Sequence, residues 1–199
     1  MKFWTDLAVD TLRDPQDAAA RIMGWQVPRR ELYIALLAVS ALTALIVGTV
    51  STLGPPPDQE LLDTVPMLAL FQRPLALFVL TAGGLIVMVH ALYWAGNAMG
   101  GQGDLGDLIA LMAWLQALRV AAQIGILALS AVVPSIAGLL ALMVMIVAFW
   151  LMLHFVSAAL HLGSLWRAFG ILMAVSAGLL LGLMLIVTLF GLAGGVSNV

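Results

Sequence analysis

The sequence predicts an all-α membrane protein: a five-transmembrane-helix bundle preceded by short interfacial amphipathic helices. Of its 199 residues, 63% are hydrophobic and only 9% are charged, whereas soluble domains carry about 25% charged residues. Five apolar stretches also reach the roughly 20 residues that a helix needs to cross a bilayer core about 30 Å thick. The predicted spans are residues 32–53, 74–95, 108–133, 136–158 and 171–193, within a transmembrane domain of residues 31–199.

Residues 1–30 are expected to form two short amphipathic helices at the membrane surface. In the first, apolar residues recur at helical spacing on one face and charged residues occupy the other. Asp14 and Pro15 restart the chain, because aspartate caps helices and proline suits the first helical position. This pair either lies in the headgroup layer, which suits tryptophan, or also docks a partner protein. The candidate residues for both roles are Phe3, Trp4, Leu7 and Trp25.

The connections between the spans differ in character. Pro55, Pro56 and Pro57 forbid a helix in the first loop. A glycine-rich connector at residues 96–107 joins the second and third spans, and a minimal turn makes the third and fourth a tight hairpin. Residues 104–116 either belong to the third span or lie in the interface.

The basic residues predict the orientation of the bundle. Five lie before the first span, and Arg167 falls on the same side in a five-span topology, whereas Arg73 stands alone on the other side. Because basic loops stay in the cytoplasm, we expect a cytoplasmic N-terminus and an external C-terminus.

Composition and motifs exclude several function classes. The net charge of −2 gives no reason to expect nucleic-acid binding, and the absence of cysteine excludes disulfides and thiolate chemistry. No phosphate-binding loop, nucleophile elbow or metalloprotease motif occurs. The sequence therefore predicts a non-enzymatic protein with no catalytic residue, no metal site and no cofactor.

Arg119 is the only charge well inside a predicted span. An arginine at the centre of a membrane helix costs about 2.5–3.5 kcal/mol on insertion scales unless it snorkels or pairs. Gln116 and Gln123 share its helical face, because they lie one turn before and after it. This polar face is a candidate anion or headgroup site, or part of a translocation path. The alternative is a structural network, or an interfacial helix whose polar side faces water.

Two histidines extend the candidate polar intramembrane site. His90 lies late in the second span and His154 late in the fourth. Histidines can bind metals or relay protons. Since no Glu-x-x-His motif or clustered carboxylates accompany them, interfacial or core histidines are the favoured interpretation.

Small residues repeat every four positions on the fifth span, at Ala174, Gly178 and Gly182. Such spacing lets helix backbones approach closely. The stripe either packs within the bundle or forms a face between two copies of the chain.

Four motifs in order along the chain carry a family resemblance. They are the helix start at Asp14, the glycine-rich turn at 96–104 leading into 108–111, the segment from 149–151 into 158–161, and the turn at 166–168. In this order they resemble the Yip (Ypt-interacting protein) family of integral membrane proteins, in its bacterial branch. The resemblance implies a five-span bundle with a cytoplasmic N-terminus, in the bacterial inner membrane. Eukaryotic members bind Rab-type GTPases, but their Asp-Leu-Tyr-Gly-Pro signature is absent here, so Rab binding is not implied.

Two functions of different classes follow. The leading one is a membrane-organising or partner-binding protein, a scaffold or accessory protein whose partners are the lipid bilayer and either a membrane protein or a second copy of the chain. The alternative is a small transporter or channel component that uses the polar face of Arg119, Gln116 and Gln123. A membrane enzyme acting on lipid has little support, because no acid–base pair is visible.

Overall fold

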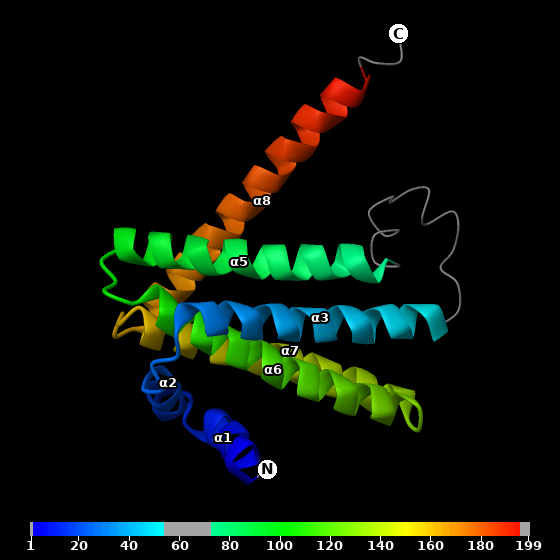
Figure 1. The fold of residues 1–199 in the computed structure, drawn as a ribbon, viewed down its shortest axis with the longest axis horizontal. Helices are drawn as coiled ribbons and strands as arrows, with labels where there is room; N and C mark the ends of the chain where they lie inside the picture. Colours follow the sequence, from blue (N-terminus) through cyan, green and yellow to red (C-terminus); the bar gives the residue numbers. More distant parts are fainter. Residues whose placement is uncertain (1, 54–72, 196–199) are drawn as a thin grey trace.

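The computed structural model describes residues 2–53 and 73–195, and these residues form helices joined by short turns (Figure 1). Five of the helices are long and apolar enough to cross a membrane. This confirms the predicted fold class. The helices are α1 (Lys2–Arg13), α2 (Pro15–Met23), α3 (Arg29–Leu53), α5 (Pro74–Ala98), α6 (Leu105–Ser130), α7 (Pro134–Ala159) and α8 (Leu165–Gly195).

Four of the long helices form a bundle in which α6 packs against both α3 and α7, and α5 packs against α3 (Figure 1). The fifth, α8, contacts α5 and α7 near its start and then diverges from the bundle. We call the end where α3, α6 and α8 begin the proximal end, and the opposite end the distal end. The short helices α1 and α2 lie against α6 and α7 toward the proximal end.

The hydrophobic core is concentrated at the proximal end. Its largest fully buried side chains include Leu7, Leu36, Leu92, Leu108, Phe155 and Ile171. The distal half instead exposes large apolar side chains, and Val132 in the turn between α6 and α7 is 77% exposed. Intramolecular packing therefore stabilises the proximal half, and the distal surface is suited to lipid contact.

Aspartates begin two of the helices. The carboxylate of Asp14 accepts hydrogen bonds from the backbone N–H groups of Gln16 and Asp17, both at 3.1 Å, and thereby caps α2 as expected. The Asp104 carboxylate accepts from the Gly106 N–H at 2.6 Å and caps α6. From there α6 is continuous to Ser130, so residues 105–116 form its first half.

The helix α8 begins at Leu165, six residues before the predicted start of the last span. The predicted span starts later because it leaves out the charged residue Arg167. Its guanidinium donates to the Met99 carbonyl at 3.0 Å and to the Leu162 carbonyl at 3.4 Å. Because carbonyl groups of neighbouring turns accept hydrogen bonds from its guanidinium, Arg167 is accommodated within the helix.

The glycine-rich connector is packed tightly against the end of α7. The Gln102 N–H donates to the Leu160 carbonyl at 3.1 Å. A Cβ atom at Gly103 would collide with the Ala159 carbonyl oxygen and lie 2.7 Å from the Leu160 Cα. The connector therefore needs glycine for close backbone approach.

Candidate functional site

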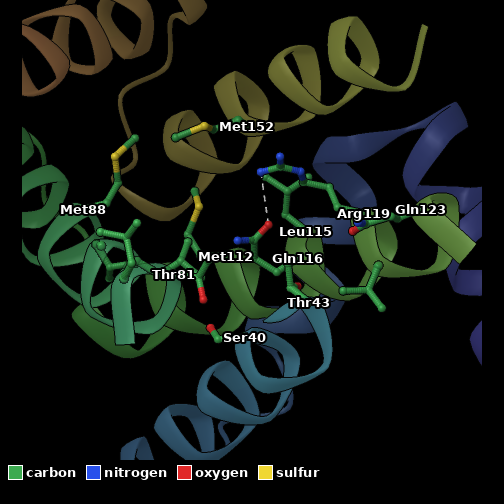
Figure 2. A pocket seen from close by; sticks show the side chains of 15 residues that line it. Ser40, Thr43, Thr81, Met88, Met112, Leu115, Gln116, Arg119, Gln123 and Met152 are labelled. Carbon is green, nitrogen blue, oxygen red and sulfur yellow. Dashed lines mark hydrogen bonds between the residues drawn. The ribbon is translucent and has the colours of Figure 1, made fainter. Parts of the chain in front are cut away.

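A cleft surrounds Arg119 between α3, α5, α6 and α7 (Figure 2). Its volume is about 420 Å³. Methionine and leucine side chains form much of its wall. Its polar lining comes from three helices: Ser40 and Thr43 from α3, Thr81 from α5, and Gln116, Arg119 and Gln123 from α6. The three residues of the predicted polar face thus share one cleft.

The guanidinium of Arg119 reaches back along α6 toward the proximal end. Its Nη1 donates to Gln116 Oε1 at 3.3 Å (Figure 2). This direction agrees with the general lean of helix side chains toward the helix N-terminus. The two ion pairs among the described residues join other side chains, Arg21 with Asp10 and Arg29 with Asp104. Within the described chain, Arg119 therefore has a neutral amide as its hydrogen-bond partner and no carboxylate as a counter-ion.

The hydroxyl groups of the cleft already donate to their own helices. Ser40, Thr43 and Thr81 donate to backbone carbonyls one turn earlier, at 2.8, 2.9 and 2.7 Å. Their protons are committed, so Arg119 is the strongest hydrogen-bond donor that the cleft offers. Guanidinium binds carboxylate and phosphate groups with paired hydrogen bonds. The arrangement thus suits an anion.

An apolar groove continues from the cleft toward the distal end. It lies between α3, α6 and α7, measures about 530 Å³, and shares Thr43, Arg119 and Gln123 with the cleft. The other residues that line it are mostly apolar. They include Val47, Ile126, Ala141, Val144, Met145 and Phe149. A polar head and an apolar tail of one molecule would each meet matching walls here.

The histidines lie elsewhere. His90 hydrogen-bonds the Tyr33 hydroxyl at 3.1 Å through Nε2 and the Ile86 carbonyl at 2.7 Å through Nδ1. His154 hydrogen-bonds the Trp150 carbonyl at 2.9 Å and packs on the Trp150 ring. Neither lines the cleft, and the described residues contain no group of three or more acidic or histidine side chains that could hold a metal.

The small-residue stripe on α8 makes no close contact within the described chain. A Cβ atom at Gly178 or Gly182 would meet nothing within 4 Å, and Ala174 is exposed. Packing of these glycines within the bundle stays a prediction that no described contact supports. A face between two copies of the chain stays a prediction.

The N-terminal helices present an aromatic surface, defined as Phe3, Trp4 and Trp25. These side chains are 51%, 54% and 40% exposed. Phe3 and Trp25 both contact Trp4, whose ring centroid lies 5.2 Å from that of Phe3 and 5.9 Å from that of Trp25. Trp4 also lies 5.9 Å from Trp114 of α6. Three aromatic side chains from the chain's start are thus gathered beside the membrane domain.

Leu7, the fourth candidate of this segment, has a different role because it is fully buried. It anchors α1, together with a hydrogen bond that Trp114 Nε1 donates to Thr11 Oγ1 at 3.1 Å. Ala18, Ala19 and Ile22 anchor α2 in the same cluster. Sequence reasoning missed Trp114, whose indole N–H inside a predicted span required a polar partner.

Beside this surface, Arg29 joins the start of α3 to the start of α6. Its Nη2 donates to Asp104 Oδ2 at 2.8 Å, and both side chains are more than half exposed. Partial burial raises the pKa of Asp104, but the Gly106 N–H and the Arg29 guanidinium outweigh it and hold this pKa below its ordinary value of 3.8. The carboxylate is therefore stabilised in its charged form.

This contact predicts a specific pH dependence. A carboxyl whose pKa is lowered by folding stabilises the protein above its unfolded pKa, and that stability is lost as the pH falls through the folded pKa. We expect the Tm of Asp104→Asn, which keeps a capping side chain, to lie slightly below that of the parent from about pH 8 to about pH 5. The difference should begin to shrink near 3.8, the ordinary value, and vanish only after the pH has fallen through the lowered pKa of the folded state. Thermal unfolding in detergent across this range would check it, and a constant difference down to about pH 2 would contradict it.

Comparison with known proteins gives one family match. The chain matches the family model of the Yip1 domain over residues 9–187, from within α1 to within α8. No curated protein and no solved structure matches it. The match confirms the predicted family, and its bacterial branch stays a prediction. The fold and this match together lead to one conclusion: the chain belongs to the Yip1-domain family of membrane proteins.

Proposed function

We propose that this protein organises membrane components by binding a membrane-protein partner at its proximal end, without catalysing a reaction. The observation that carries the proposal is the aromatic surface, whose three side chains stay exposed although the helices beneath them are anchored in the core. Tryptophan is enriched at the energetic centres of protein interfaces. A large rigid ring that is already positioned also loses little entropy on binding.

The proposal places the proximal end in the cytoplasm and the protein in a bacterial inner membrane. The orientation is supported by the distribution of basic residues, because Lys2, Arg13, Arg21, Arg29 and Arg30 all lie before the first span or at its start. The aromatic surface would then lie at the cytoplasmic edge of the bilayer, within reach of both lipid headgroups and a partner's juxtamembrane segment.

A double substitution tests partner binding. The change Phe3→Ser with Trp4→Ser removes two exposed rings and leaves the buried anchor intact. We expect a stoichiometric partner that co-purifies with the parent in mild detergent to be lost by about tenfold or more, as for interface centres. The matched control is Leu12→Ser, which alters a side chain of the same helix that is 54% exposed.

Retention of the partner by the double variant would contradict the proposal, as would equal loss in Leu12→Ser. Purification of the parent as a lone chain would also count against it. In the last case, rings lying in the headgroup layer would suffice to explain the aromatic surface.

The second candidate, a small transporter or channel component, is favoured by the cleft at Arg119. A polar site within a membrane helix bundle is a common mark of a translocation path. This candidate requires flux across the bilayer, and liposomes holding the parent and an anion-sensitive dye would report it.

A further inference from the structure

We propose that the cleft at Arg119 and the groove that continues from it bind one anionic phospholipid. The lipid phosphate would lie against the Arg119 guanidinium, and an acyl chain would follow the groove between α3 and α7. This site shares no residue with the aromatic surface, so lipid binding and partner binding stand or fall separately.

The charge of Arg119 has no counter-anion within the described chain. Its one hydrogen bond within the described chain goes to neutral Gln116, and no described carboxylate pairs with it. A charge of this kind inside a membrane helix normally pairs or faces a polar cavity. Phosphate fits the planar fork of a guanidinium, and an anionic phospholipid has no cation of its own to compete for that phosphate.

The groove supplies the complementary apolar half of the site. It begins at Thr43, Arg119 and Gln123, which also line the cleft. It then runs toward the distal end past Val47 of α3 and Ala141 of α7. A free inorganic anion would leave these apolar walls without an occupant, whereas an acyl chain would fill them. Apolar walls directly beyond a cationic side chain favour an amphiphile.

The depth of Arg119 also fits a lipid of the proximal leaflet. Tryptophans mark the membrane interface, and Trp114 lies five residues before Arg119, about 7.5 Å along the helix. The guanidinium reaches back toward that level through Gln116. All six tryptophans lie in the proximal half or in the N-terminal segment: Trp4, Trp25, Trp94, Trp114, Trp150 and Trp166. The lipid's chain would thus point distally, as chains of that leaflet do.

Lipid retention tests the site directly. The full chain would be purified from vesicles of phosphatidylcholine with a minority of phosphatidylglycerol, and the phosphatidylglycerol bound per protein would be measured by native mass spectrometry. We expect Arg119→Gln to lower this ratio about tenfold, the scale of one charge-assisted hydrogen bond. Arg119→Lys should retain part of it, and Arg30→Gln, which removes an exposed charge outside the cleft, should leave it unchanged.

A second variant tests the groove without altering charge. Ala141→Trp would fill the apolar hollow and should lower phosphatidylglycerol retention while Arg119 remains in place. This variant also keeps the proposal testable if Arg119→Gln fails to fold.

Three outcomes would overturn the proposal. One is equal retention by the parent and the folded variants. Another is equal retention of phosphatidylcholine and phosphatidylglycerol, since the site would then not select a lipid of net negative charge. The third is displacement of bound lipid by millimolar inorganic phosphate, which would indicate a site for a free anion.

Discussion

Replacing Gly103 with alanine is expected to destabilise the folded protein by about 3 kcal/mol, the upper part of the range for overpacking. The added methyl group would collide with the Ala159 carbonyl oxygen and lie 2.7 Å from the Leu160 Cα. Both obstacles are backbone atoms at the end of α7, so rotation of a side chain cannot relieve the clash. The connector would have to move away and lose the hydrogen bond from Gln102 to Leu160. The midpoint of thermal unfolding in detergent would report the loss.

Two other glycines provide graded controls for this prediction. At Gly83 a Cβ atom would meet nothing within 4 Å, so Gly83→Ala should leave the Tm unchanged or raise it through the better helix propensity of alanine. At Gly96 the obstacles are methyl groups of the Leu160 side chain, which can move in part, so Gly96→Ala should have an intermediate effect. A Tm for Gly103→Ala equal to that of Gly83→Ala would show that the connector does not approach α7 as described.

The five spans could be predicted because hydropathy and length decide them, and both are local properties. The ends of these helices are harder to predict from the sequence. Composition predicts a loop at Arg167, yet this residue lies in the first turn of α8. There its guanidinium donates a hydrogen bond to the carbonyl of Met99, at the end of α5. That partner is distant in sequence, so no local rule identifies it. The same limit applied to the glycine-rich connector, whose need for glycine arises from contact with α7.

Only part of the candidate site can likewise be predicted from the sequence. Helical spacing alone places Gln116 beside Arg119, and their hydrogen bond follows from it. Thr43 and Thr81 join them from other helices, and their hydroxyls are common enough in membrane helices to carry no signal alone. The sequence names His90 and His154 as candidates but favours interfacial or core histidines, and in the structure they hydrogen-bond the Tyr33 hydroxyl and the Trp150 carbonyl. Which polar residues meet is thus a property of helix packing.

The distribution of packing explains why the cleft lies where it does. Buried side chains concentrate at the proximal end, where α1 and α2 cover α6 and α7. Beyond Arg119, toward the distal end, the helices carry few buried residues, and there the apolar groove opens. The N-terminal helices thus complete the proximal half of the fold, and the proposed lipid would complete the distal half.

This division predicts that α1 detaches when its anchor is made polar. Leu7 is fully buried, and truncating a buried leucine costs about 2–5 kcal/mol even without burying a charge. Leu7→Asp is therefore expected to release α1 from the membrane domain and to speed amide hydrogen exchange in residues 2–13 roughly a hundredfold, which corresponds to about 3 kcal/mol. Mass spectrometry of peptides from this segment would measure the rates.

The matched control is Leu12→Asp, the same substitution in the same helix at a side chain that is 54% exposed, where exchange should stay close to that of the parent. Peptides from α5 should exchange at parental rates in both variants, because few contacts of α1 reach that helix and its own partners are α3, α6 and α8. Equal exchange in the two variants would mean that α1 is held by the headgroup layer rather than by the core. Faster exchange in Leu7→Asp alone would mean that the protein itself positions the aromatic surface, which a binding function requires.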